Sequence, residues 1–292
     1  MTTQVEEESG NSAEDIEFLR RTLADSLAEA GGGNQPLLRL TDEELAVIDP
    51  VPEDDGFVPS PHLHGLSDSE KETAIATALR SLVSRELIEV TNIEELDDLM
   101  RQQEATDAAG QDVGHRTPVD MNVAQEAAIA LNLRRTAERA LAAELNTSAG
   151  MSHAFVYIHS SDLFMIERVT TGGLHLFTLT NSIESAADII QDLVDPFGVA
   201  DKDGRSRQLD PHALDSAHVG SPLQQVIDGA LVVGRLMVLS DSPGALVITY
   251  ATERELWTVT VEEPHAPTGI VAQAVGAKSL GRKIADLLRI PE

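Results

Sequence analysis

Residues 154–180 read AFVYIHSSDLFMIERVTTGGLHLFTLT, and this stretch decides the fold class. Apolar runs at 154–158, 163–170 and 174–180 alternate with short polar or glycine-containing breaks, a spacing typical of strands joined by tight turns. Gly172 and Gly173 mark the second of these turns, because glycine adopts backbone angles that other residues avoid. We therefore expect β-structure from residue 153 onward.

Helices and strands alternate beyond this stretch. An amphipathic helix is expected at 182–194 and another at 221–234, where Pro222 suits the first turn. The runs at 236–239, 246–250 and 256–261 have hairpin-sized gaps and predict an antiparallel meander, followed by a strand at 270–275 and a helix at 279–288. This order predicts the α+β class, an antiparallel sheet layered with helices.

The first hundred residues have a helical pattern. A helix is expected at 40–48, a proline-rich loop at 49–66, a second helix at 67–85, a strand at 87–90 and a third helix ending at Met100. Capping boxes begin these helices: Thr41 with Glu44, Ser67 with Glu70, and Thr91 with Glu94. Helix, loop, helix and strand follow one another in this order in a winged-helix unit.

We divide the chain into four parts on this basis. Residues 1–35 are an acidic flexible tail, 36–104 the winged-helix-like region, 105–118 a linker or long loop, and 119–292 the α+β sheet domain. Residues 120–145 are expected to be mostly helix, with a strand at 128–133 as the alternative. The apolar positions between Ile16 and Leu27 allow an alternative interpretation, in which this segment is a helix that docks on the fold. The tail interpretation instead predicts that deleting residues 1–33 hardly changes Tm.

The charge of the chain restricts its partners. It carries 21 Lys and Arg against 49 Asp and Glu, a formal net charge of −28, and it has no cysteine. Such a surplus repels phosphate backbones and anionic lipid heads, so nucleic acid and membrane partners are not expected. The absence of cysteine excludes disulfides and thiolate metal sites. With neither a secretion signal nor a membrane-length apolar run, we expect a cytoplasmic protein.

The sequence contains fragments of metal-binding and phosphate-binding motifs, but the residues that complete each motif are missing at the required spacing. Residues 201–204 (DKDG) begin like a calcium loop but lack its later glycine and glutamate, and 276–279 (GAKS) lacks the glycines of a phosphate-binding loop. His62 and His64 have no evident third ligand for a metal. His175 is expected to be a hydrogen-bonded sheet histidine, and Trp257 to pack against the sheet. We predict no catalytic, cofactor or metal residues, and no enzyme activity.

Short motifs resemble the start and end of EspG-like proteins, the type VII (ESX) secretion-associated chaperones of actinobacteria. They are LTDEEL at 40–45, VPSP at 58–61, the Ser67–Glu70 box and ALRSLVSREL at 78–87, where Glu86 replaces the family's glycine. Residues 246–261 and 279–288 are similar to the closing hairpin and final helix. The resemblance implies a cytosolic, non-enzymatic α/β chaperone that holds an aggregation-prone tip of a helical secretion substrate.

Two other functions stay open at this point. The first is a winged-helix regulatory or adaptor protein with a C-terminal sensor domain, in which Arg80 and Arg85 lie on the recognition helix. Acidic residues crowd that helix, which favours protein contact over DNA contact. The second is a hydrolase that uses His159 and Asp162, although neighbouring residues in one segment do not make a triad.

Overall fold

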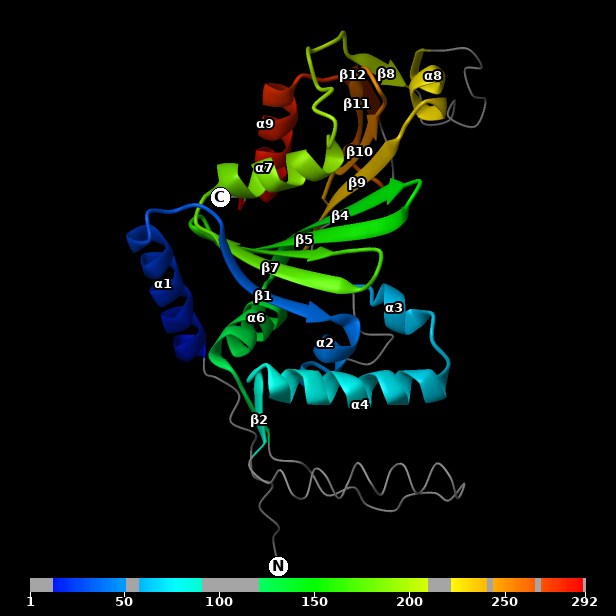
Figure 1. Cartoon of the computed structure of the whole chain (residues 1–292). Coiled ribbons are helices and arrows are strands. Elements are labelled where there is room, and N and C mark those ends of the chain that lie inside the picture. Colours follow the sequence, from blue (N-terminus) through cyan, green and yellow to red (C-terminus); the bar gives the residue numbers. More distant parts are fainter. Residues whose placement is uncertain are drawn as a thin grey trace, which may run out of the picture.

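The computed structural model describes residues 13–50, 58–90, 121–209, 222–240, 244–265 and 269–290. Within this part, ten strands form one antiparallel sheet in the order β1-β7-β6-β5-β4-β9-β10-β11-β12-β8 (Figure 1). The strands are β1 (Gln35–Thr41), β4 (Arg139–Thr147), β5 (Gly150–Ser160), β6 (Leu163–Val169), β7 (Leu174–Thr180), β8 (Arg207–Leu209), β9 (Val232–Leu239), β10 (Leu246–Ala251), β11 (Leu256–Val261) and β12 (Ile270–Ala274). The predicted α+β class is confirmed.

The stretch at 154–180 forms the predicted strands. β5, β6 and β7 follow one another as antiparallel neighbours, and the turn between β6 and β7 closes with a hydrogen bond from Gly173 N to Thr170 O of 3.0 Å. Gly173 has φ +74°, and a Cβ placed there would lie 2.5 Å from Oδ2 of Asp42. The turn therefore needs glycine both for its backbone angle and for the close approach of Asp42.

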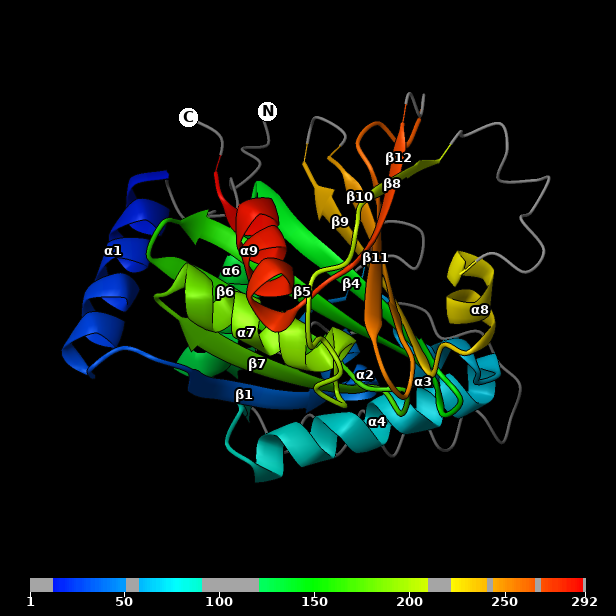
Figure 2. The same ribbon diagram turned by 90° about the horizontal axis from the view of Figure 1, so that it is seen from above.

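Helices α7 (Ile183–Val194) and α9 (Ala277–Leu288) cover one face of the sheet, and they also pack on each other (Figures 1 and 2). Their buried residues join the inward side chains of β4, β5, β6, β9 and β10 in one core. The apolar positions of α7 recur at helical spacing, and Ala186, Ile190 and Val194 are all buried, as the sequence pattern predicts.

The opposite face of the β1–β7–β6–β5 half lies under helices from the N-terminal part. They are α1 (Ala13–Glu29), α2 (Asp42–Ile48), α4 (Asp68–Ser84) and α6 (Gln125–Thr136), and their apolar side chains share a second core with β1, β5, β6 and β7. The short helix α3 (Pro61–His64) lies next to α2 (Figure 1). β2 (Ile88–Val90) and β3 (Met121–Val123) form a separate two-stranded sheet.

Two of the three predicted capping boxes lie in the described residues, and both are confirmed. Thr41 caps α2 together with Glu44, and Ser67 caps α4 together with Glu70. The third box and its helix, 91–100, and the predicted linker, 105–118, lie outside the described residues. β1 joins the 36–104 region to the sheet of the 119–292 region, because it pairs antiparallel with β7.

Three predictions of secondary structure are wrong. Residues 139–145 belong to β4, although their alanines favour helix; Ala140 and Ala142 lie on the face opposite Leu141, Ala143 and Leu145, so alanine on both faces obscures the polar–apolar alternation of a strand. The helix expected at 221–234 ends earlier, as α8 (Pro222–Asp228), and residues 232–234 open β9. The expected loop at 49–66 contains α3. The alternative strand at 128–133 is part of α6.

Helix α1 is docked, which the flexible-tail interpretation did not expect. Leu27 is 4% exposed and belongs to the core on the α6 side of the sheet. Nη2 of Arg20 donates to Thr136 O at 2.7 Å, a bond to the last residue of α6. The amphipathic spacing that the sequence left open thus corresponds to a helix whose apolar side packs against the fold.

Replacing Leu27 with Ala should lower the free energy of unfolding by about 2–4 kcal/mol, because it leaves a cavity under α1. Phe18→Ala is the matched control on the same helix, since Phe18 is 74% exposed, and it should change stability by less than about 0.5 kcal/mol. Denaturant unfolding of both variants measures this. Equal effects would mean that α1 does not dock.

The end of α4 holds a strained residue. Among the described residues, Glu86 is the one residue other than glycine with a positive φ, +59°. Leu87 N donates to Leu82 O at 2.9 Å and Glu86 N donates to Val83 O at 3.0 Å. These bonds form a C-terminal helix cap in which the left-handed position is usually occupied by glycine. The glycine of the EspG-like motif would occupy this position.

Glu86→Gly should therefore stabilise the protein by about 1 kcal/mol, because glycine adopts the left-handed conformation without a steric cost. Glu89→Gly, an exposed strand position nearby, should instead destabilise it. Thermal unfolding of the two variants distinguishes them. A loss of stability in Glu86→Gly would contradict the strain at this site.

Candidate functional site

A cluster of buried charged side chains lies between the sheet and the N-terminal helices. At its centre is His175 of β7, whose Nε2 is 2.8 Å from Oδ1 of Asp42 and whose Nδ1 is 2.7 Å from Oε1 of Glu167. All three side chains have no exposed area. β6 and β7 place Glu167 and His175 on the same face of the sheet, and β1 carries the chain directly into Asp42, the first residue of α2.

Two further residues hold Glu167 from the other side. The hydroxyl of Tyr157 donates to Oε2 at 2.6 Å, and Nε of Arg134 donates to the same oxygen at 3.2 Å. Arg134 also donates to Asp49, just after α2, at 2.7 Å. The more exposed Arg135 donates to the other carboxylate oxygen of Asp49 at 3.0 Å. The cluster therefore connects α2, α6, β5, β6 and β7.

The hydrogen bonds fix the charge of His175. Ionised carboxylates only accept hydrogen bonds, so an imidazole between two of them must donate from both nitrogens and is protonated. Burial lowers the pKa of His175, but the hydrogen bonds and charges of Asp42 and Glu167 outweigh burial and raise the pKa above 6.5. Burial raises the pKa of Glu167, but His175, Arg134 and Tyr157 together lower it below 4.5.

With His175 protonated, three acids and three bases balance in this cluster: Asp42, Asp49 and Glu167 against His175, Arg134 and Arg135. Burial and the charge of Glu167 also raise the pKa of Tyr157 well above 10, so its hydroxyl stays a donor. Each central group is bonded within the fold and closed to solvent. This arrangement can hold elements together, but it offers no open position to a substrate.

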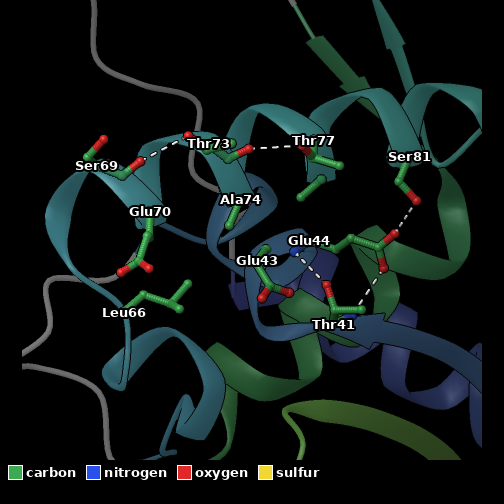
Figure 3. Close-up of a pocket in the computed structure, with 11 residues that line it drawn as sticks. Thr41, Glu43, Glu44, Leu66, Ser69, Glu70, Thr73, Ala74, Thr77 and Ser81 are labelled. Atoms are coloured by element: carbon green, nitrogen blue, oxygen red, sulfur yellow. Dashed lines mark hydrogen bonds between the residues drawn. The ribbon is translucent and has the colours of Figure 1, made fainter.

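A shallow groove lies next to this cluster, between the start of α2 and the length of α4 (Figure 3). It encloses about 550 Å³, and small residues of α4 such as Ala74 and Thr77 form one wall. Glu44 on its floor is held by Ser81 at 2.7 Å and by Nη1 of Arg85 at 2.8 and 2.7 Å. The guanidinium of Arg85 is thus paired with Glu44, unlike that of a residue that reads a DNA groove. Arg80 is exposed on α4.

The two failed loop motifs contact each other. The carboxylate of Asp203 accepts from Gly276 N at 2.9 Å and from the hydroxyl of Ser279 at 2.8 Å. The first turn of α9 is therefore bonded to a carboxylate of this chain, at the place where a phosphate-binding loop would hold a phosphate. These bonds lower the pKa of Asp203. The pairing explains both motif fragments without a ligand.

The histidines singled out in the sequence have different surroundings. The prediction for His175 is confirmed, since both its ring nitrogens are hydrogen-bonded. Burial, followed by the charge of Arg20, lowers the pKa of His159 to about 4, and its ring nitrogens have no hydrogen-bond partner; Asp162 is bonded to Ser160 instead. Among the residues that the structure describes, no three histidine or acidic side chains gather to hold a metal ion, and His62 contacts Glu43.

An open strip lies on the face of the sheet opposite α7 and α9. We use this name for Glu144, Val233, Arg235, Met237, Ile248 and Tyr250, which come from β4, β9 and β10. On one side of it stands the core under α6, and on the other the small core in which Val226 of α8 packs against Trp257 and Val259. The expected packing of Trp257 against the sheet is confirmed.

The sequence patterns did not single out most of the buried cluster. The available signal was Glu167, which lies at an inward position of β6 in line with Leu163, Met165 and Val169. A charged residue at such a position must find a partner when the strand is buried. Asp42 gave no comparable signal, because an acid in the first turn of a helix is common on electrostatic grounds alone.

Comparison with protein-family models finds no match, and a search of curated proteins finds no relative either. None of the described helices combines the length and the apolar character that crossing a membrane requires.

Removing Arg134 should show that the buried cluster is structural. Arg134→Met should lower the free energy of unfolding by about 3–5 kcal/mol, because it leaves buried carboxylates with fewer donors. Arg135→Met is the matched control: its side chain is 58% exposed, so the loss should be about 1 kcal/mol or less. Denaturant unfolding measures both. Similar small losses in the two variants would contradict the structural role.

Proposed function

We propose that this chain is a non-enzymatic chaperone that binds an apolar helical segment of a partner protein, a secretion substrate of the kind handled by EspG-like proteins. The observation that carries the proposal is the open strip. Its central strand, β9, presents Met237 with 41% of its area exposed, although β5 and β11, two strands away on either side, carry buried side chains on the same face.

The register of the strands shows how exposure changes across the strip. One row of neighbours runs from Phe155 through Ala142, Met237, Leu246 and Val261 to Ile270. Phe155 and Ile270 at its ends are 3% and 2% exposed, whereas Met237 in the middle is 41% exposed. Apolar area is thus exposed at β9, as expected of a surface that a partner protein covers on binding.

The strip has the dimensions of a helix site. β4 and β11 are three strand spacings apart, about 14 Å. A helix with its side chains is about 10–12 Å wide, so one helix fits between the two cores. The opposite face of the same strands packs against α7 and α9, which shows that a helix layer suits these strands. We therefore assign the strip to one amphipathic helix of a partner.

Charge gives the partner a second property. The strip itself contains Glu144 and Arg235, paired at 3.5 Å with about half or more of each side chain exposed. The chain as a whole carries −28. A partner helix with an apolar stripe and basic flanks would be attracted to this acidic surface. Its basic residues would also avoid the repulsion that an acidic partner would meet there. The acidic body also keeps the loaded complex soluble, which is what a chaperone requires.

Two further observations support the EspG-like interpretation. Glu86, which stands in place of the family's glycine, has the backbone conformation that glycine favours. The expected closing hairpin corresponds to β10 and β11, and the expected final helix to α9. The internal bonding of the buried cluster supports a role without catalysis, since its acids and bases are already engaged with one another.

Co-expression with helical proteins encoded next to its gene tests the proposal. We expect a stable one-to-one complex, measured by light scattering after size exclusion, in which the partner stays soluble. Met237→Lys with Ile248→Lys should weaken binding at least about tenfold, because a buried lysine faces the apolar stripe. Phe18→Lys, an apolar position on α1 that is 74% exposed, should leave binding unchanged.

Three outcomes would contradict the proposal. The first is the absence of a complex with every such protein. The second is a complex that the double variant binds as tightly as the original chain does. The third is a dimer of this chain alone that the double variant dissociates, which would assign the strip to a second copy.

A further inference from the structure

The surface helix α3 depends on a buried side chain. Oδ2 of Asp42 accepts hydrogen bonds from His62 N at 2.7 Å and from Leu63 N at 3.3 Å, while Oδ1 faces His175. Asp42 N in turn donates to Gly173 O at 2.8 Å. One carboxylate thus joins α3 to the interior of the sheet, and its inner oxygen is bonded to a titratable group.

Loss of the proton from His175 affects its two bonds differently. A neutral imidazole keeps one N–H, so one carboxylate must then face a nitrogen lone pair. Glu167 has two other donors, Tyr157 and Arg134, that hold its charge in place. Asp42 has only the two amides of α3 as further donors to its side chain among the described residues. The contact with Asp42 is therefore the one that fails.

We propose that His175 is a proton-controlled latch: its protonated form locks Asp42 and α3 against the sheet, and its neutral form releases α3. The groups facing His175 are Asp42 from α2 and Glu167 from β6, with Tyr157 of β5 and Arg134 of α6 behind Glu167. Asp49 lies beyond Arg134. Next to α3, Glu43 contacts the ring of His62.

Release of α3 would change the neighbouring groove. Leu66, two residues after α3, and Glu43, at the start of α2, both line the groove between α2 and α4. Figure 3 shows them on the same side of that groove. A buried proton would thus control the shape of a surface site without any ligand entering the interior.

The direction of the pH effect follows from the pKa of His175, which is raised above 6.5 in the folded state. A raised pKa adds stability that is complete below pH 6.5 and is lost as the pH rises through the folded pKa. The latch is therefore closed in mildly acidic solution and opens toward alkaline pH. Glu167, with its lowered pKa, remains ionised throughout this range.

Hydrogen exchange of the His62 and Leu63 amides tests the latch in the full chain, from about pH 6 to about pH 9 after correction for intrinsic exchange. Their protection should fall as His175 loses its proton, about tenfold for each unit by which its folded pKa exceeds 6.5. Amides of α7 on the other face should show no such change. Protection that is constant across this range would overturn the proposal.

Variants identify the titrating group. Asp42→Asn keeps an oxygen for the two amides and presents an NH₂ to neutral His175, so the pH dependence should disappear while α3 stays protected. His175→Gln should leave α3 weakly protected at every pH. His62→Gln keeps its backbone amide and removes its own titration, so it should retain the full pH dependence. Loss of the dependence in His62→Gln, or its persistence in Asp42→Asn, would contradict the latch, even if His175→Gln fails to fold.

Discussion

The protonated imidazole between Asp42 and Glu167 is the interaction on which the N-terminal half of the structure depends. It joins the first residue of α2 to strands β6 and β7, and through Glu167 it reaches Arg134 and α6. Each of these charges would cost several kcal/mol to bury alone. Together, the three buried acids are balanced by His175, Arg134 and the more exposed Arg135.

Acidic residues have two different roles in this chain, one inside the fold and one on its surface. Inside the fold, acids are matched by specific bases and position α2 and α3. On the surface, the excess of Asp and Glu gives the chain its net charge of −28 and disfavours nucleic acid and anionic lipid. The sheet adds a third element: both ends of its second face are covered, and the open strip at β9 lies between them. The proposed partner helix would complete that layer.

The sequence was informative where local physics sets the structure. Turn glycines and apolar runs located β5, β6 and β7, and capping boxes located α2 and α4. It misled at β4, because alanines favour helix unless the surrounding sheet overrides that preference. It could not show that residues 35–41 add a strand beside β7, since nothing local specifies a partner so distant along the chain.

The buried site shows the same limit. His175 was predicted to be a satisfied sheet histidine from the apolar strand around it, but its partner Asp42 lies 133 residues away. Glu167 gave a signal as a lone acid in an apolar strand, whereas Arg134 and Asp49 resemble ordinary residues at the end of a helix. Long-range charge pairing is set by the fold, so only the structure could assemble this cluster.

The charge of His175 at neutral pH tests this account most directly. Nitrogen-15 NMR of the imidazole ring distinguishes a nitrogen that carries a proton from one that does not. The structure predicts that both ring nitrogens of His175 are protonated at pH 7, each hydrogen-bonded to a carboxylate. A neutral ring with one bare nitrogen at that pH would contradict the account, because the buried acids would then lack the charge that balances them.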